Sequence, residues 1–296
     1  MINNEDIIII GAGPAGVNCS IQLKRYGFEP LVIEQNKIGG LAANANLIEN
    51  YCAFPNGIKG DNFVKVLAKQ FNNNNIRLHS EKVINVSKEN NKYSVKTTKG
   101  DFLCNHLVIA TGTTPNILNF TSEKIFYEVD KLKEKNDLYN KNIVIIGAGD
   151  AAFDYALNLA DKNKITILNK SNRTKCLDLL KNRVLHHKNI SYLEFTRVNN
   201  IQEIDDKLKL SGKDQKKDLE LNCDYLLGAI GRIANTEFLS ENLINSENHD
   251  NFYIIGDAKN GIFRQIAIAC GDGLITAMKI YNKKVGEYNE SSCLCR

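Results

Sequence analysis

The sequence predicts an α/β protein built from two doubly wound nucleotide-binding units, and three observations support this fold class. Four consecutive isoleucines, Ile7 to Ile10, lead directly into a glycine-rich turn. A nearly identical stretch recurs at residues 142–152. Short apolar runs that end in small residues alternate with helical runs along the 296 residues, a length sufficient for two domains. This alternation is typical of parallel sheets with helical crossovers.

The first glycine turn follows an apolar run that is too short for a helix and β-branched throughout, as in a buried parallel strand. Gly11, Gly13 and Gly16 form the pattern G-x-G-x-x-G. Its glycines allow a tight turn, close approach to a pyrophosphate, and packing of the next helix on the strand. Pro14 suits the first turn of that helix. Glu34 follows the next predicted strand, 30–33, and is placed to bind a ribose hydroxyl.

The next part of the chain completes the first unit. Gly39-Gly40-Leu41 offers a second place where backbone can lie against a ligand. Residues 47–60 form a loop, and Asp61 is expected to cap a helix that ends near Asn72. The predicted strands that follow are 76–80, 82–88, 92–98, 101–104 and 106–110, with a hairpin turn at Lys99-Gly100 and a final turn at Thr111-Gly112.

The second unit repeats the first at a constant offset of 136 residues, with Gly147, Gly149 and Ala152 standing for the three glycines. Two such motifs in one chain are a far more specific signal of dinucleotide binding than a single motif. A helix is predicted from Asp150 to about Ala160, followed by a strand over 164–168. The sequence therefore predicts a second dinucleotide site.

The residues after this second strand differ in charge from those in the first unit. Glu34 corresponds to Lys170 at the same offset, or to Asn169 if one residue is lost from the connection. An acid at this position accepts hydrogen bonds from a free 2′-hydroxyl, whereas a base accommodates a 2′-phosphate. Lys170, Arg173 and Lys175 therefore favour NADPH, and the alternative is a solvated basic loop.

The last part of the chain returns to the first site. Strands are predicted near 190–194, 197–204, 207–211 and 218–222, and Tyr225 to Arg232 repeats the pattern of a strand and a glycine turn. Residues 252–255 form a short strand that ends at Gly256-Asp257, and a helix opens at Arg264-Gln265 and runs to about Tyr281. A carboxylate at a strand end and a helix N-terminus can bind a ribitol hydroxyl and the edge of a flavin.

Composition excludes several functional classes. The formal net charge is +4 with acids and bases interspersed, which does not suggest nucleic-acid binding. No apolar run approaches the roughly 18 residues of a membrane span, and the N-terminus does not resemble a signal peptide, so we expect a cytoplasmic protein. The eight cysteines are mostly single, and His186-His187 has no neighbours at ligand spacing, so neither a disulfide framework nor a metal site is expected.

Taken in order, these motifs resemble the low-molecular-weight thioredoxin reductases and the related ferredoxin-NADP reductases of the same fold. The resemblance implies two Rossmann-like three-layer domains: an FAD domain of residues 1–114 and 234–296, and an NAD(P) domain of residues 115–233 inserted in it. It also implies hydride transfer from NAD(P)H to the flavin, usually in a homodimer. The motifs that carry it are Gly11 to Gly16, Glu34, Gly39-Gly40, Ile48-Glu49-Asn50, Ala110-Thr111-Gly112, Gly147 to Ala152, Ala229-Ile230-Gly231, Gly256-Asp257, Arg264-Gln265 and Ala269 to Gly273.

The resemblance also implies which residues bind the cofactors. For FAD these are Gly11, Gly13, Gly16, Glu34, Gly40, Asn50, Thr111, Asp257 and Gln265, together with the adjoining Pro14, Ala15, Gln35, Leu41, Val83, Ala110, Gly112, Gly256, Arg264 and Ile266. For the second nucleotide they are Gly147, Gly149, Asp150, Ala151, Lys170 and Lys175. No catalytic acid or base is named, because the flavin performs the redox chemistry. The helix after Arg264 is expected to stabilise negative charge on the flavin N1–C2=O edge.

One departure from the resemblance bears on the electron acceptor. Thioredoxin reductases carry a redox-active Cys-x-x-Cys shortly before the second glycine motif. Here residues 125–131 contain no cysteine, and none occurs between Cys104 and Cys176. Disulfide exchange needs a thiolate, so this segment cannot perform it. The basic motif of the family is matched only by Lys170 and Lys175, which weakens the case for NADPH over NADH.

Three functions follow from these observations. The favoured one is an FAD-dependent oxidoreductase that passes electrons from NAD(P)H directly to an external carrier such as ferredoxin or flavodoxin. The first alternative is a thioredoxin or disulfide reductase that uses Cys293 and Cys295, whose Cys-x-Cys disulfide would be strained and oxidising. The second is a non-catalytic FAD-binding sensor with a degenerate NAD(P) site. Cys52 is interpreted as a loop thiol and Cys270 as a packing residue.

Overall fold

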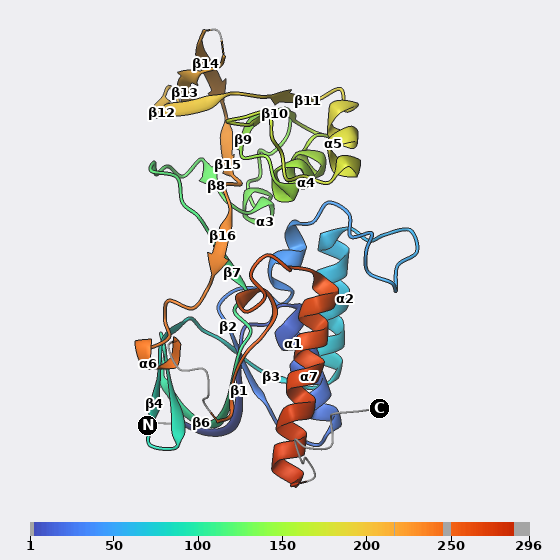
Figure 1. The fold of residues 1–296 in the computed structure, drawn as a ribbon, viewed down its shortest axis with the longest axis vertical. Coiled ribbons are helices and arrows are strands. Elements are labelled where there is room, and N and C mark those ends of the chain that lie inside the picture. Colours follow the sequence, from blue (N-terminus) through green and yellow to red (C-terminus); the bar gives the residue numbers. More distant parts are fainter. Residues whose placement is uncertain (1–2, 216, 245–249, 287–296) are drawn as a thin grey trace. The chain divides into compact units, whose positions relative to one another are not determined.

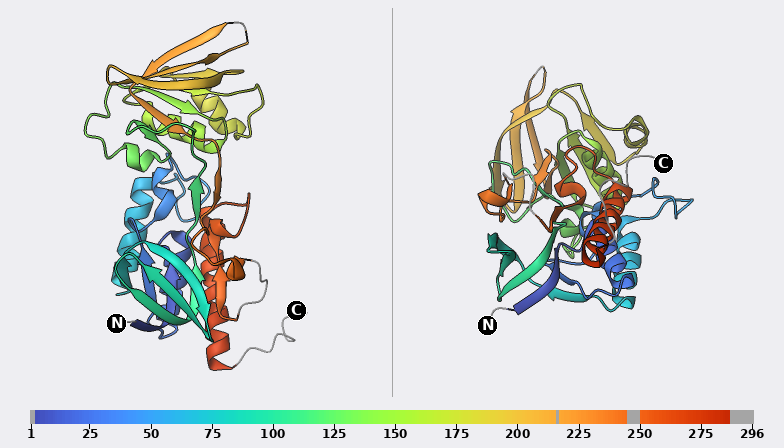
Figure 2. Two further views of the ribbon diagram at one scale, coloured as in Figure 1. Left: turned by 90° about the vertical axis from the view of Figure 1, so that its left-hand side faces the viewer. Right: turned by 60° about the horizontal axis from the view of Figure 1, so that its bottom comes forward.

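The computed structural model describes residues 3–215, 217–244 and 250–286, which are shown in Figures 1 and 2. The chain divides into two compact units. Unit 1 contains Met1–Ala42, Asp61–Thr113 and Ala234–Arg296, and unit 2 contains Ala43–Gly60 and Thr114–Ile233.

Unit 1 is built on one mixed sheet. Its central strands are parallel in the order β3-β2-β1-β6, with β17 also parallel to β6, while β5 and β4 continue it in antiparallel fashion. In register, Ile8 lies beside Leu31 on one side and Leu107 on the other. The strands are β1 (Asn3–Ile10), β2 (Leu31–Glu34), β3 (Arg77–Ser80), β4 (Val83–Glu89), β5 (Lys92–Thr97), β6 (Asp101–Ile109) and β17 (Phe252–Ile254).

Two predictions for unit 1 need correction. The segments 101–104 and 106–110 form the single strand β6, because the polar Asn105 that separates them points outward and donates to Asp6 Oδ1 at 3.1 Å. The helix predicted to start after Asp61 begins at Gly60, so Asp61 lies in its first turn, where an acid favours the helix dipole. The hairpin turn at Lys99-Gly100 is confirmed, since Thr97 and Gly100 close it by a backbone hydrogen bond of 3.0 Å.

The sheet of unit 1 is covered on both faces. On one face, the parallel strands share a buried cluster with the antiparallel strands β4 and β5 of the same sheet, which includes Ile8, Leu31 and Val95. Helices α1 and α7 run side by side, as Figures 1 and 2 show. The helices of this unit are α1 (Pro14–Arg25), α2 (Gly60–Asn73), α6 (Glu241–Ile244) and α7 (Ile266–Val285), with the short 3₁₀ turn η2 (Gly256–Ala258). A second 3₁₀ turn, η1 (Gly40–Asn44), contains the boundary between the units after Ala42.

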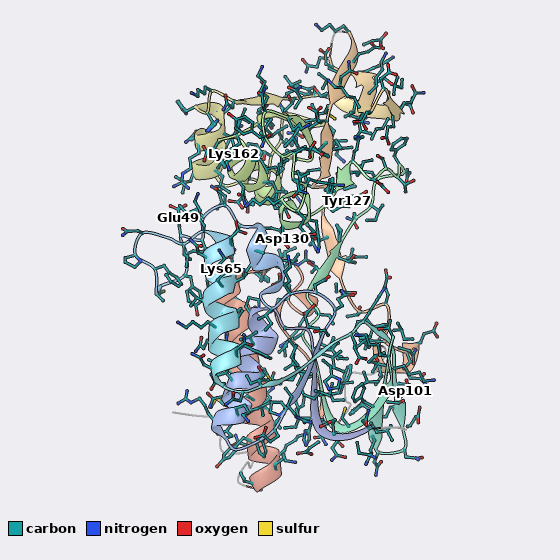
Figure 3. The ribbon with its side chains drawn as sticks, turned by 180° about the vertical axis from the view of Figure 1, so that it is seen from behind. Glu49, Lys65, Asp101, Tyr127, Asp130 and Lys162 are labelled. Atoms are coloured by element: carbon teal, nitrogen blue, oxygen red, sulfur yellow. The ribbon has the colours of Figure 1, made fainter. Side chains whose placement is uncertain are left out.

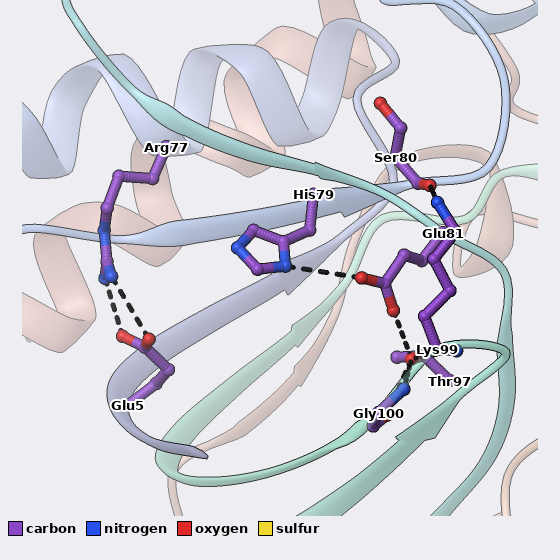
Figure 4. Close-up of polar contacts among 8 residues, drawn as sticks. All are labelled: Glu5, Arg77, His79, Ser80, Glu81, Thr97, Lys99 and Gly100. Atoms are coloured by element: carbon purple, nitrogen blue, oxygen red, sulfur yellow. Dashed lines mark hydrogen bonds and ion pairs between the residues drawn. The ribbon is translucent and has the colours of Figure 1, made fainter.

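Polar contacts at the edge of this sheet fix strand β3 (Figure 4). Arg77 donates to both carboxylate oxygens of Glu5, at 3.1 and 2.6 Å. His79 lies 3.4 Å from Glu81, whose other oxygen accepts the hydroxyl of Thr97. The Arg77–Glu5 pair lies at the end of the sheet opposite the glycine turn, because Glu5 precedes that turn on β1. His79 and Glu81 lie at the other end, where Ser80 pairs with Glu34 and Glu81 N donates to Glu34 O at 3.0 Å.

Unit 2 is built on a fully parallel sheet in the order β11-β10-β9-β15-β8. One face packs against helices around Phe153 and Val184, and the other packs against a three-stranded antiparallel sheet around Leu208 and Leu210. The three-layer α/β class predicted from the sequence is therefore confirmed.

Several elements of unit 2 were not predicted, namely β8, α3 and α5. Its elements are β8 (Ile125–Phe126), α3 (Val129–Leu132), β9 (Asn142–Ile146), α4 (Asp150–Leu159), β10 (Lys164–Leu168), α5 (Asp178–Leu185), β11 (Ile190–Leu193), β12 (Arg197–Ile204), β13 (Lys207–Lys213), β14 (Asp218–Cys223) and β15 (Tyr225–Gly228).

The chain passes between the units at β7 (Thr113–Pro115) and β16 (Arg232–Ala234), which pair as a two-stranded sheet. The domain boundaries expected from the sequence, after residues 114 and 233, fall within these two strands and stay a prediction. Residues 43–60, however, belong to unit 2 by their contacts, although the prediction placed them in the first domain. The physical reason is a set of polar contacts centred on Asn44, described below. Within the described residues, no helix is long and apolar enough to cross a membrane.

Candidate functional site

The first glycine turn of unit 1 is closed against two neighbouring strands. Gly11 has φ +106°, donates its amide to Ile33 O at 2.8 Å, and would place a Cβ 2.4 Å from Ala110 O. Ala110 in turn donates to Ile10 O at 2.8 Å. Only glycine fits such a position, because it combines a left-handed backbone with a close contact.

The space in front of this turn is open. A Cβ at Gly13 would meet no atom within 4 Å, and Gly13 caps α1 without any side-chain hydrogen bond. Gly40, at the start of η1, approaches it, since a Cβ there would lie 3.2 Å from Gly13 Cα. The first amides of α1 are thus available to an anion, as in other helix N-termini that bind pyrophosphates.

Glu34 lies at the rim of this turn with its carboxylate held by the backbone. Its Oε2 accepts from Ala12 N at 2.7 Å and its Oε1 from Asn36 N at 2.8 Å. Each oxygen keeps further acceptor capacity, which suits the two hydroxyls of a ribose. The predicted role of Glu34 is therefore compatible with its geometry, and Gln35 follows it at an exposed position.

Other predicted residues of unit 1 come from distant parts of the chain. Thr111 donates its hydroxyl to Asn235 O at 2.6 Å, and Gly112 accepts from Asn235 N at 3.0 Å. Asp257 lies in η2, and Gln265 is the N-cap of α7 with an extended backbone.

Two predicted FAD residues are placed differently from the rest. Asn50 lies in the segment that belongs to unit 2. The Val83 side chain packs in the unit 1 core, where it is 8% exposed. Any contact of Val83 with a ligand would therefore be made by its backbone.

The second glycine turn repeats the backbone contacts of the first. Gly147 has φ +129°, donates to Leu168 O at 3.1 Å, and would place a Cβ 2.1 Å from Ala229 O. Ala229 donates to Ile146 O at 2.8 Å, and Gly149 caps α4 with no atom within 4 Å of a Cβ. The internal repeat seen in the sequence is thus also a repeat of hydrogen bonds.

These matched bonds decide which residue corresponds to Glu34. Because Leu168 O takes the place of Ile33 O, the next residue, Asn169, takes the place of Glu34. The Asn169 side chain is buried and directed into its own loop: Nδ2 donates to Arg173 O at 3.0 Å and to the Tyr192 hydroxyl at 2.8 Å, and Oδ1 accepts from Ser171 N at 3.2 Å. A neutral amide therefore stands where the first unit has a carboxylate.

The loop after β10 is also tied to the second glycine turn. Thr174 donates its hydroxyl to Ala148 O at 2.5 Å, and Leu177 N donates to Asp150 Oδ1 at 2.8 Å. Lys170, Arg173 and Lys175 are exposed on this ordered loop. Unit 2 therefore presents three cations on a loop that is fixed to its glycine turn.

The segment that replaces the family's dithiol holds an ion pair. Glu128 accepts from Arg232 Nη1 at 2.7 Å and from Asn44 Nδ2 at 2.6 Å, while Asn44 Oδ1 accepts from Asp130 N at 2.9 Å. Tyr127 and Asp130, labelled in Figure 3, carry no thiol. The segment is thus built for packing residues 43–60 onto unit 2.

A second contact of that segment involves a half-buried acid that no sequence motif indicated. Asp154 Oδ2 accepts from Asn46 N at 2.8 Å, and Arg183 binds both oxygens of Glu49 at 2.6 and 2.9 Å. Burial raises the pKa of Asp154 to about 6. The sequence signal for Asp154 was an acid on the apolar face of α4, one turn after Asp150.

The described cysteines do not form a redox pair. Cys19, Cys104, Cys223 and Cys270 are buried, and burial raises the pKa of the first three thiols to about 12. Cys52 is exposed, and none of the six described cysteines is in a disulfide. Cys293 and Cys295 lie outside the described residues. The described part of the chain also contains no cluster of three or more residues that could hold a metal ion.

Comparison with known proteins agrees with this geometry. The family model described as pyridine nucleotide-disulphide oxidoreductase matches residues 5–273. The thioredoxin reductase of Rickettsia conorii is 25% identical over 92% of this chain and 96% of its own. That of Borreliella burgdorferi is 25% identical over 94% of this chain and 91% of its own.

Solved structures show the same fold at lower identity. Lactococcus lactis thioredoxin reductase in the FR conformation has a TM-score of 0.85 and 23% identity, covering 95% of this chain and 99% of its own. The bacillithiol disulfide reductase Bdr (YpdA) of Staphylococcus aureus has a TM-score of 0.74 and 20% identity, covering 96% and 100%.

Proposed function

Because the chain belongs to the pyridine nucleotide-disulphide oxidoreductase family, we propose that NADPH, bound by unit 2, reduces FAD held by unit 1, and that the electrons then leave to a one-electron carrier such as ferredoxin or flavodoxin. The chain is a thioredoxin reductase-like flavoprotein oxidoreductase, and FAD and NADPH are the cofactors of that group. The observation that carries the proposal is the pair of matched glycine turns, which differ at Glu34 and Asn169.

The residues of unit 1 fit FAD. The open space at Gly13 and the amides of α1 suit a pyrophosphate, and the Glu34 carboxylate suits a ribose. Asp257, in η2, would hold the ribityl chain, and the first amides of α7 after Gln265 would donate to the flavin edge. When bound, FAD supplies the redox chemistry, so the chain needs to supply only orientation and local field.

The residues of unit 2 fit NADPH better than NADH. Asn169 removes the carboxylate that would repel a 2′-phosphate, and Lys170, Arg173 and Lys175 are exposed beside it. The hydrogen bonds of Asn169, Thr174 and Asp150 hold this loop in place without a ligand. A preordered loop loses less conformational freedom on binding.

The cysteine side chains favour direct transfer of electrons to an external carrier over transfer through a dithiol. The segment 125–131 offers the Glu128 ion pair in place of a dithiol. Burial raises the pKa of the Cys19, Cys104, Cys176 and Cys223 thiols, which disfavours the thiolate. The named thioredoxin reductases among the relatives make a thioredoxin-like partner the competing acceptor.

Anaerobic titration of the purified yellow protein with NADPH tests the proposal. Bleaching of the flavin absorbance, followed by reoxidation on adding ferredoxin or flavodoxin, is the expected result. Reoxidation by thioredoxin that is lost in a Cys293→Ser/Cys295→Ser variant would instead establish the disulfide reductase. No bleaching with NADPH or NADH would indicate a non-catalytic flavoprotein, and a protein that does not bind FAD would overturn the whole proposal.

We further propose that the active form is a homodimer. Helix α7 exposes an apolar stripe at helical spacing: Ile268 is 40% exposed, Ile275 53% and Met278 50%. Exposed apolar side chains in one patch are typical of a subunit interface. Sedimentation equilibrium of wild type and of Ile275→Lys tests this, and a wild type that remains monomeric contradicts it. A cytoplasmic location remains a prediction.

A further inference from the structure

Asp272 lies on helix α7 within the motif Ala269 to Gly273, to which the sequence assigned no contact. Its Oδ2 accepts from Gly256 N at 2.9 Å and from Asn260 Nδ2 at 2.6 Å. These two partners stand at the beginning and the end of the turn that carries Asp257. One carboxylate oxygen therefore holds both ends of this turn.

The turn needs such an acceptor because it begins where the sheet ends. Ile255, which follows strand β17, donates its amide to Ile109 O at 2.9 Å. The next amide, Gly256 N, donates to Asp272 Oδ2. Gly256 has φ +64°, and its carbonyl accepts from Lys259 N and Asn260 N at 2.9 and 3.1 Å. Residues 256–260 thus form a tight turn, and its first amide is bound by Asp272.

Asp272 is itself held on a rigid base. The adjacent Gly273 lies against α1, where a Cβ would fall 2.3 Å from Ala15 O and 2.9 Å from Cys19 N. A Cβ at Gly256 would lie 2.9 Å from Ala15 Cβ. The turn, α7 and the first residues of α1 are therefore packed directly on one another, and α1 begins at the glycine turn that faces the pyrophosphate position.

We propose that Asp272 is a positioning residue of the FAD site, which fixes the 256–260 turn so that Asp257 meets the ribityl hydroxyls while α1 holds the pyrophosphate. The inference rests on the proposed binding of FAD by unit 1. Asp272 acts through the turn and is not assigned a contact with the cofactor.

The experiment measures FAD affinity of the apoprotein by quenching of flavin fluorescence. Asp272→Ala removes both hydrogen bonds and is expected to raise the FAD dissociation constant by about 10- to 100-fold, as for hydrogen bonds to charged groups. Asp272→Asn keeps an acceptor oxygen and is expected to restore affinity to within about threefold of wild type. Asn260→Ala removes one bond without changing a charge and serves as the second variant if Asp272→Ala does not fold.

The matched control is Glu5→Ala, which also removes a doubly hydrogen-bonded carboxylate from unit 1, at the opposite end of β1 from the glycine turn. It is expected to lower the thermal midpoint of the apoprotein and to leave FAD affinity unchanged. Binding of 2′,5′-ADP to unit 2 is expected to be unchanged in every variant.

The outcomes separate this inference from the function on which it rests. Wild-type FAD affinity in Asp272→Ala, or in Asn260→Ala where the former does not fold, would overturn the positioning role. Equal loss in Asp272→Ala and Asp272→Asn would overturn it as well, because the acceptor oxygen would then not matter. A wild type that does not bind FAD would overturn the proposed function, and this inference with it.

Discussion

The two glycine turns share their backbone contacts and differ in what surrounds them. Gly11 and Gly147 each donate to the neighbouring strand and each exclude a Cβ by contact with a carbonyl, of Ala110 and Ala229. The first copy then places Glu34 on its rim, whereas the second uses Asn169 to organise a basic loop. The shared contacts form the fold, and the differing residues are the ones that we propose to select the ligand.

The third position of the motif shows a second difference. A Cβ at Gly16 would lie 2.0 Å from Gly11 O, so the first copy requires glycine there. The second copy accepts Ala152, which is fully buried. Helix α4 makes room by starting with a tight turn: Ala152 N donates to Gly149 O at 3.0 Å and Phe153 N only at 3.4 Å, whereas α1 has Val17 N to Gly13 O at 3.0 Å.

Substitutions at the contacts that both glycine turns share are expected to have the largest effects on the free energy of unfolding. Gly11→Ala and Gly147→Ala each place a methyl within 2.4 Å of a carbonyl oxygen on a left-handed backbone. Each is expected to cost about 3 kcal/mol or more of unfolding free energy, through overpacking and backbone strain together. Urea denaturation of both variants measures this. If one of them unfolds at the wild-type midpoint, the two turns are not equivalent.

Substitutions at the third position of the glycine motif are expected to lower the free energy of unfolding by smaller amounts, which differ between the two copies. Gly16→Ala forces a methyl against Gly11 O and is expected to cost about 2–3 kcal/mol. Ala152→Gly, its mirror in the second copy, loses only helix propensity and a buried methyl, for about 1–2 kcal/mol. The same denaturation assay compares them. Equal costs would show that the close approach at Gly16 relaxes without strain.

The half-buried acid of unit 2, Asp154, predicts a pH dependence of stability. The pKa of Asp154 is raised by burial from 3.8 to about 6, with Asp150 and Glu49 adding to the shift and Arg183 opposing it. The folded state therefore binds this proton more tightly than the unfolded state, so the associated stability is fully present below pH 3.8 and is lost as the pH rises through about 6.

Asp154→Asn tests this dependence, because its amide oxygen still accepts from Asn46 N. Relative to wild type, the variant is expected to gain about 1–2 kcal/mol at pH 7.5 and little at pH 4, after a discount for partial solvent screening. Denaturation at the two pH values measures the difference. A gain that is the same at both would assign the effect to packing instead of ionisation.

The comparison of the two turns also shows what the sequence can and cannot predict. Both turns, their strands and the three-layer class follow from local patterns, since the isoleucine runs and glycine spacings act within about ten residues of one another. The attachment of residues 43–60 to unit 2 depends on Asn44 and Glu128, which are 84 residues apart. Likewise, the strand register was needed to decide whether Asn169 or Lys170 corresponds to Glu34. The loss of one residue from a connection cannot be recognised from the neighbouring sequence.

Substitutions in the basic loop after β10 are expected to have the smallest effect, which is on the KM for NADPH. Lys170→Ala and Lys175→Ala are each expected to raise the KM for NADPH about fivefold, since exposed charges on a phosphate are partly screened, and to leave the KM for NADH unchanged. Lys164→Ala is the control, because Lys164 is an exposed lysine at the other end of β10. The effect is expected to shrink as salt is raised from 0.05 to 0.5 M, as screening requires. A parallel change with NADH would place these lysines outside the 2′-phosphate site, and Asn169 alone would then account for the difference between the two turns.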